Sequence, residues 1–207
     1  MAQNSADSYK YFKVEPIKWR VLTDNYSGKR LLLAESILVS HRYAESSINY
    51  ANSEIRAYLN GTFWNTAFTD SEKSMIDETD VDNSAASTTD AGGNLTQATS
   101  YACGTTKDKI FLLSEKEAMT TGYGFASNSS YGTGNSRIRM TTDFAKASGA
   151  YQNTTAGCGG WWWLRSPFYY ISNGARYVYY GGDARINSYS YVDLTYGGVC
   201  PALTLKN

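Results

Sequence analysis

The sequence predicts an α+β fold: short helices in the first half, a small and mostly antiparallel sheet in the second half, and much irregular loop. Helix-capping residues stand before short helical patterns as far as residue 148, and from Gly157 onward glycines separate short strand-like runs. The 207 residues contain no internal repeat and no obvious linker. We therefore expect a single domain over residues 1–207.

The first element is a predicted β-hairpin. Ile17–Thr23 and Lys29–Ala34 are rich in strand-forming residues, and the intervening Asp24–Gly28 has the composition of a turn.

Short helices are expected next. Ser53–Asn60 spaces its apolar residues at helical intervals, with Asn52 or Ser53 as the N-cap and Gly61 as the stop. Three further helices carry similar signals: Asp70–Ile76 capped by Thr69, a helix from the Ser114/Glu117 capping box to Gly122, and Thr142–Ser148 ending at Gly149.

The segment Thr79–Asp108 has no periodicity and few large apolar residues, which predicts a surface insertion over 79–108. Its acidic run Asp80–Asn83 lacks the glycine and the distal glutamate of a calcium-binding loop. Strands are expected in the runs that follow: Ile110–Leu113, Trp161–Arg165, Arg176–Tyr180, Ser190–Val192 and Val199–Leu205.

Composition argues against several functions. Lys and Arg total 19, as do Asp and Glu, so the chain lacks the basic surface of a duplex nucleic-acid binder. His41 is the only histidine, which disfavours Ser–His–Asp and Cys–His catalysis. Cys103, Cys158 and Cys200 include no CxxC pair, so we expect free thiols or one incidental bridge. We expect no catalysis, no cofactor and no metal site.

No apolar run approaches the ~20 residues that cross a bilayer, so no membrane insertion is expected. Met1–Lys10 does not resemble a signal peptide. The sequence favours a soluble chain, either cytoplasmic, associated with a phage, or one module of a surface protein.

The segment Phe168–Leu203 contains eight tyrosines, much Asn, Ser, Asp and Gly, and no Lys, Glu, Gln, Met or Trp. Those five absent types account for 29 of the first 167 residues. Codons that end in a pyrimidine encode none of the five but can encode every residue present. Tyr, Ser, Gly and Asn are also the residues of evolved binding surfaces, where rigid rings provide contact area at low entropic cost. This segment is therefore the candidate binding region.

Several stretches resemble one known pattern: IKWRVL (17–22), RLLLAES (30–36), SEIRAYLNGTF (53–63), KIFLLSEKEA (109–118), TTDFAKASGA (141–150), WWWLRSP (161–167) and GGVCPALTL (197–205). Together they resemble a bacterial domain family with a WWLRSP segment and a GVRPAL ending. That family is similar to the C-type-lectin-fold proteins related to formylglycine-generating enzyme, a group that includes the variable proteins of diversity-generating retroelements.

The resemblance implies a C-type lectin-like fold with a variable ligand-binding region over 168–196, rewritten from a template by mutation at adenines. The partner would be an unidentified protein or cell-surface macromolecule. The implied ligand-binding residues are Tyr169, Tyr170, Ser172, Asn173, Arg176, Tyr177, Tyr179, Tyr180, Asp183, Arg185, Asn187, Tyr189, Tyr191, Asp193 and Tyr196.

Other residues are assigned to the scaffold. The tryptophans of WWWLRSP should pack in the core and hold the variable region against it. Arg165 should be buried with its charge against a carboxylate or carbonyl groups. The small or branched side chains should face inward: Ala175, Val178, Val192, Val199, Ala202 and Leu203.

Two positions depart from the family pattern. Cys200 stands where the family has arginine, which implies a lost ion pair or a mutated codon. Phe168 replaces the usual glycine.

Four functions remain to be weighed. The first, which we expect, is a diversified, non-enzymatic display protein that binds a macromolecular target. The second is an enzyme like formylglycine-generating enzyme, which needs a copper-binding cysteine pair. A calcium-dependent sugar lectin is disfavoured because its EPN, QPD and WND motifs are absent. The last is a fixed-sequence accessory or scaffold domain with a constant partner, whose tyrosines would fill cross-strand pairs.

Overall fold

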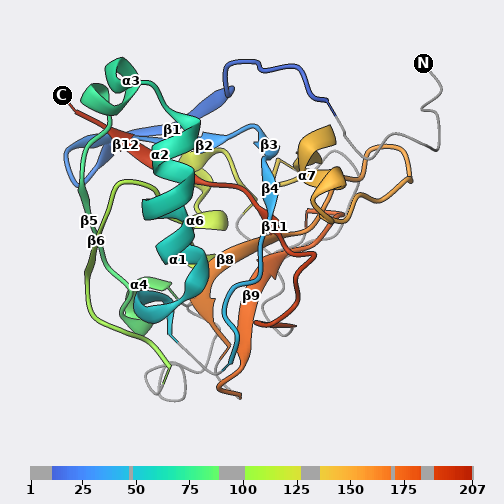
Figure 1. The fold of residues 1–207 in the computed structure, drawn as a ribbon. Coiled ribbons are helices and arrows are strands. Elements are labelled where there is room, and N and C mark those ends of the chain that lie inside the picture. The colour runs from blue at the N-terminus through green and yellow to red at the C-terminus, as the bar shows by residue number, and fades with distance from the viewer. Residues whose placement is uncertain are drawn as a thin grey trace.

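The α+β prediction is confirmed by a computed structural model, which describes residues 11–46, 49–88, 101–126, 136–168, 171–182 and 189–206. Within these residues the chain forms short helices, several small sheets and long loops (Figure 1). No helix in the described ranges is long and apolar enough to cross a membrane.

The described strands are short. They are β1 (Trp19–Tyr26), β2 (Lys29–Ala34), β3 (Ser36–Ile37), β4 (Val39–Ser40), β5 (Thr79–Val81), β6 (Thr106–Asp108), β7 (Met140–Thr141), β8 (Trp162–Pro167), β9 (Gly174–Val178), β10 (Ser190–Tyr191), β11 (Gly198–Val199) and β12 (Ala202–Leu205).

Two sheets organise these strands. One is three-stranded, in the order β1-β2-β12, and entirely antiparallel. The other is five-stranded, in the order β10-β9-β8-β11-β4, and antiparallel except between β8 and β11. Smaller pairs join β3 to β7 and β5 to β6. The expected hairpin is β1–β2, which turns at Ser27 and Gly28, both with positive φ.

The described helices lie mostly in the first two thirds of the chain. They are η1 (Tyr50–Asn52), α1 (Glu54–Tyr58), η2 (Leu59–Phe63), α2 (Trp64–Ala67), α3 (Asp70–Met75), α4 (Ala85–Thr88), α6 (Glu115–Ala118), η3 (Thr121–Tyr123) and α7 (Asp143–Ala147). The expected caps Ser53, Thr69 and Ser114 are confirmed, since each accepts a hydrogen bond from a first-turn N–H, and Thr69 and Ser114 form capping boxes. Thr142, expected as the first helical residue, caps α7 in the same way.

Two expected helix ends are wrong. Gly61 does not end the first helix, because α1 continues through the π-helical turn η2 into α2, and the Phe63 side chain at that turn is buried. Gly61 has no positive φ, so it lacks the left-handed conformation of a terminal glycine. The helix expected to reach Gly122 ends at Ala118.

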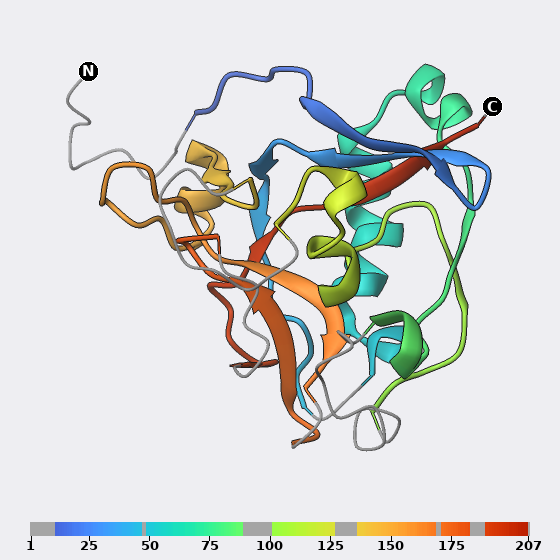
Figure 2. The same ribbon diagram turned by 180° about the vertical axis from the view of Figure 1, so that it is seen from behind.

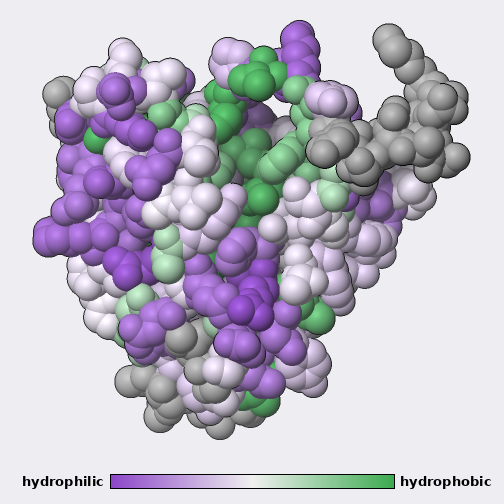
Figure 3. All heavy atoms as spheres, viewed as in Figure 1, coloured by the Kyte–Doolittle hydropathy of each residue, from purple (hydrophilic) through white to green (hydrophobic). Residues whose placement is uncertain are grey.

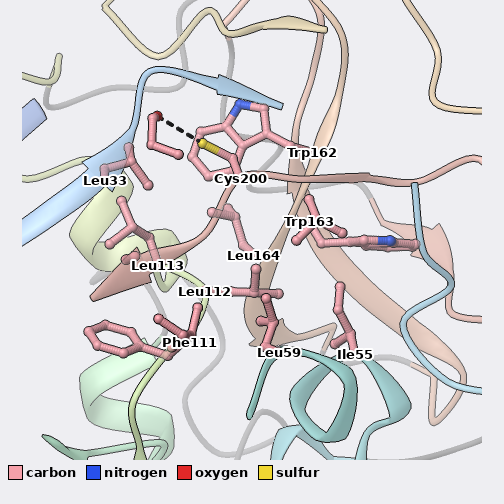
Figure 4. Close-up of a cluster of buried hydrophobic side chains, with 14 of the residues drawn as sticks. Leu33, Ile55, Leu59, Phe111, Leu112, Leu113, Trp162, Trp163, Leu164 and Cys200 are labelled. Carbon is pink, nitrogen blue, oxygen red and sulfur yellow. Dashed lines mark hydrogen bonds between the residues drawn. The ribbon is translucent and has the colours of Figure 1, made fainter. Parts of the chain in front are cut away.

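The core lies between the helical run α1–α2, the residues of 110–113 and strand β8 (Figure 4). All six residues of β8 are buried, as expected for a strand covered on both faces. Trp162 and Trp163 point to different sides of β8, so their rings join the two faces of the sheet to the rest of the molecule. The residues assigned to face inward are all buried: Ala175, Val178, Val192, Val199, Ala202 and Leu203.

Ile110–Leu113 is buried as predicted but is not a strand; its ladder contact is a single bridge from Phe111 to Ala202. The Leu113 carbonyl accepts from the Arg165 backbone N–H, and side chains bond to several of the other backbone groups. The Asn60 carboxamide oxygen accepts from the Lys109 and Ile110 N–H groups at 2.8 and 3.3 Å. These bonds satisfy the buried backbone without a second strand.

The prediction of a surface insertion over 79–108 is wrong for the described ends of that segment. Strands β5 and β6 pair with each other, and Val81 is fully buried. The buried Asn83 side chain donates to the Val81 carbonyl at 2.9 Å and to the Thr106 hydroxyl at 3.0 Å. These ends belong to the packed domain, and residues 89–100 lie outside the described ranges.

Candidate functional site

The outer face of β9 carries the predicted binding surface. Strand pairing sets Trp163 opposite Tyr177 and Trp162 opposite Val178, so alternate residues of β9 face opposite sides of the sheet. Val178 is fully buried, whereas Tyr177 and the following Tyr179 are partly exposed. In Figure 2, β9 lies next to β8 on the side of the molecule away from the helical run α1–α2.

Seven of the described residues line a groove of about 340 Å³ on this face, hereafter the aromatic groove: Tyr151, Trp161, Tyr177, Tyr179, Tyr180, Ser190 and Tyr196. Several of its rings contact one another edge to face. Trp161 lies 5.4 Å from Tyr177 and 5.8 Å from Tyr196 between ring centroids, at interplanar angles of 70° and 86°. Such pairs stabilise one another beyond their burial by about 0.5–1.5 kcal/mol each.

The groove rests on Trp163, which is fully buried beneath Trp161, with ring centroids 4.8 Å apart. Its indole N–H donates to the His41 carbonyl at 3.0 Å. Gly197 must be glycine here, because a Cβ atom would lie 2.0 Å from the Trp163 indole nitrogen. The next residue has the same restriction: a Cβ on Gly198 would lie 2.4 Å from the Trp161 carbonyl oxygen.

A second aromatic patch lies at the β10 edge of the sheet. Tyr189 stacks on the buried Phe168 with centroids 4.4 Å apart, and Tyr191 meets Tyr189 edge-on at 5.4 Å. Gly174 leaves room for this stack, since a Cβ there would lie 2.9 Å from the Tyr189 ring. A hydrogen bond with Tyr191 raises the pKa of the Tyr189 phenol.

The predicted binding residues fall into three sets. Those placed at least partly on the surface are Ser172, Asn173, Tyr177, Tyr179, Tyr180, Tyr189, Tyr191, Asp193 and Tyr196. Tyr169, Tyr170, Asp183, Arg185 and Asn187 lie outside the described residues. Arg176 forms the third set, because its side chain is inside the molecule.

Arg176 is 1% exposed, so its assignment to the ligand-binding surface is wrong. Strand alternation places it on the same face of β9 as Val178. Its guanidinium lies 3.6 Å from the buried Glu115 carboxylate and 5.0 Å from the centroid of the Phe168 ring. These contacts give Arg176 a role in the scaffold.

Arg165 is buried against a carboxylate, as predicted. Its guanidinium forms a two-pronged ion pair with Glu117 and donates to the Leu112 carbonyl at 2.8 Å. Glu117 also accepts from the Tyr26 hydroxyl at 2.8 Å. Burial acts to raise the pKa of Glu117, but the charge of Arg165 outweighs it and holds that pKa below its usual value.

Cys200 lies in the core, and its thiol donates to the Ala34 carbonyl at 3.2 Å (Figure 4). A buried arginine occupies the neighbouring space: the Arg139 guanidinium donates to the same carbonyl at 3.1 Å. An arginine at position 200, as in the pattern that the sequence resembles, would therefore place a second cation beside Arg139. All three cysteines are free thiols.

Thiol labelling tests this placement. Burial raises the pKa of Cys200 to about 12, and burial also leaves the sulfur inaccessible. We expect iodoacetamide at pH 8 to modify the half-buried Cys103 in the native protein, and to modify Cys200 only after denaturation. Peptide mass analysis of each cysteine measures the rates; rapid native labelling of Cys200 would contradict its placement.

Three groove residues, Trp161, Tyr151 and Ser190, were not assigned to the binding site from the sequence, and Ser190 was assigned to an expected strand. Trp161 was assigned to the core, and at 6% exposure it forms the floor of the groove. Tyr151 was not assigned at all, although it is 41% exposed and lies 5.9 Å from the Tyr180 ring. Its segment carries no motif, so only the tertiary fold brings it to the groove.

A second hollow, of about 440 Å³, lies beneath residues 11–18, which arch over the domain (Figure 3). Its walls include Phe12 and Phe144, which meet edge-on at 5.5 Å, and charged residues of both signs. The hollow is built from residues 11–18 (hereafter the arm), from Ser36 and Leu38, and from the start of α7, and not from the last strands.

The chain belongs to the family DUF6273, described as a domain of unknown function, whose profile matches residues 27–207. The match includes the whole aromatic groove but not the arm over the second hollow. Neither a search of curated proteins nor a search of solved structures finds a match. Among the described residues, no group of three or more His, Cys, Asp or Glu is placed to hold a metal ion.

Proposed function

We propose that this chain is a non-enzymatic display protein whose aromatic groove binds a macromolecular target, and that a retroelement rewrites the region 168–196. One observation carries the proposal. Outward-facing tyrosines of the last strands share a groove, while the residues between them, such as Val178 and Val192, are buried in the scaffold. Side chains in the groove can therefore change without changing the core.

We further propose that the fold is C-type lectin-like. In support, a small sheet contains the last strands, and an irregular face surrounds it. The non-enzymatic assignment is supported by the surroundings of His41. Its Nδ1–H donates to the Arg42 carbonyl at 2.6 Å, and its ring stacks on Tyr58 with centroids 4.4 Å apart.

The groove contains enough aromatic side chains for micromolar binding of a partner. Truncating a well-buried aromatic contact costs about 2 kcal/mol or more. Micromolar binding needs a total of about −8 kcal/mol. The five groove tyrosines, at about 2–3 kcal/mol each once covered by a partner, contribute roughly 10–15 kcal/mol, and the upper part of that range reaches this value after association costs of several kcal/mol.

Comparison of the surrounding DNA tests diversification. We expect a near-copy of the 3′ end of the gene close to a reverse-transcriptase gene, with mismatches confined to positions where the copy carries adenine. Mismatches spread over all four bases would refute the retroelement. Absence of any near-copy would favour the fixed-partner alternative.

The scaffold can be tested by one pair of variants. Changing Tyr179 and Tyr180 together to serine is expected to lower the melting temperature by only a few degrees, because both rings are partly exposed. Val178→Ser, on the adjacent inward position, removes a fully buried side chain and is expected to cost more than the double change. Thermal unfolding followed by circular dichroism measures both; the reverse order would place the phenols in the core.

A further inference from the structure

Among the residues that the structure describes, the lining of the aromatic groove contains no charged side chain. It consists of six aromatic rings and the hydroxyl of Ser190. The rings provide electron-rich faces, and the hydroxyl groups of its tyrosines and of Ser190 provide hydrogen-bond acceptors. Such a surface interacts favourably with an organic cation.

The charges near the groove point to the same kind of partner. Between 157 and 205, the two arginines that the structure describes, Arg165 and Arg176, are both buried and paired with glutamates. Asp193, between two groove residues in the chain, is exposed. Arg42 is surrounded by acidic groups: Glu54 at 2.7 Å, with Glu45 and Asp193 further raising its pKa. The described surface here is thus electron-rich and acidic.

The groove rings do not lie in one plane. Trp161 is nearly perpendicular to Tyr196, and Tyr177 is tilted 69° from Tyr179. Ring planes at large angles form more than one wall, so a flat group can lie against one ring while its edge approaches another. A planar guanidinium has this shape, and its five N–H donors match the phenol and serine oxygens around it.

We propose that the aromatic groove receives an arginine side chain of the protein partner. This inference rests on the proposed function and names the chemistry of the group that binds. Tyr151 and Trp161 lie before residue 168, so they form a constant part of the groove. Tyr177, Tyr179, Tyr180 and Tyr196 come from the region proposed to vary and would adjust the fit around the same cation.

The test is an NMR titration of the full chain with a capped tripeptide, acetyl-Gly-Arg-Gly-amide, following the indole N–H of Trp161. The matched ligand contains citrulline, which has nearly the same shape as arginine and no charge. We expect the arginine peptide to bind roughly threefold to thirtyfold more tightly than the citrulline peptide. Equal affinities, or no binding of either peptide, would overturn the inference.

Matched variants localise the binding. Tyr151→Leu removes a ring and is expected to weaken arginine binding, whereas Tyr151→Phe keeps the ring and should retain most of it. Ser190→Lys puts a positive charge in the groove and should weaken binding, whereas Ser71→Lys adds the same charge at an exposed position of α3, outside the groove lining, and should have little effect. Equal responses within either pair would overturn the assignment to this groove.

The kind of cation is also decided by competition. If acetyl-Gly-Lys-Gly-amide or choline binds more tightly than the arginine peptide, the groove is specific for a compact ammonium group and the arginine assignment is wrong. The proposed function is tested separately by the DNA comparison. An adenine-restricted pattern of mismatches together with no arginine binding would leave the display function in place and remove only this inference.

Discussion

Replacing Arg165 with methionine is expected to lower the free energy of unfolding by about 3–5 kcal/mol, because it leaves the Glu117 carboxylate buried without its counter-ion. For a domain of this size the melting temperature should fall by roughly 6–20 °C. The double variant Arg165→Met/Glu117→Gln should recover part of the loss, since it removes the orphaned charge and keeps an oxygen for the Tyr26 hydroxyl.

The control is Arg20→Gln. Arg20 pairs with Glu35 at 2.8 Å, but both side chains are about one third or more exposed, so the loss should stay below about 1 kcal/mol. Chemical denaturation measures all the variants. A loss at Arg165 no larger than that at Arg20 would contradict the central role of the buried pair.

This pair also gives a pH dependence with a definite sign. Arg165 holds the pKa of Glu117 below its usual value in the folded chain, despite burial. The stabilisation is therefore complete above the unfolded pKa, roughly pH 4.3, and is lost as pH falls through the lower folded value. Arg165→Met should flatten the stability profile below about pH 4.3.

The second large effect is expected at Gly197. Gly197→Ala places a methyl group 2.0 Å from the Trp163 indole nitrogen, so the ring must move and its hydrogen bond to His41 must break. Overpacking of this kind costs about 1–3 kcal/mol, and here we expect the upper end. Because Trp163 supports Trp161, the groove should also lose affinity for the arginine peptide proposed above.

Gly61→Ala is the matched control. Nothing lies within 4 Å of a Cβ at Gly61, and the residue is helical. The change should raise stability by about 0.5–1 kcal/mol. The two glycine variants should therefore shift the unfolding midpoint in opposite directions; a shift of the same sign in both would contradict the packing around Trp163.

Local signals in the sequence predicted much of the fold. Capping residues such as Thr69 and Ser114 act within one helical turn, so their effect can be read without the tertiary structure. The ends of the helices were harder to predict. The side chain of Phe63 is buried beyond Gly61 and the helix continues, a packing effect that no local rule contains.

In the candidate site, too, some residues could be placed from local sequence signals, whereas others depend on the tertiary structure. Alternation along β9 was available in the sequence: once Val178 was assigned inward, Arg176 should have been assigned inward too, since both lie on the same face of the strand. Tyr151 could not have been found, because it reaches the groove through the loop after α7. The backbone N–H of Ile110 likewise donates to the side chain of Asn60, which is distant in the sequence, so local signals could not predict this bond.

The final residues join both principal sheets: β11 inserts between β8 and β4, and β12 pairs with β2. A protein shortened or frameshifted before Gly198 would lack both strands and leave the edges of two sheets open. Such a product cannot complete its fold. Presentation of the groove therefore depends on translation in frame through these two closing strands.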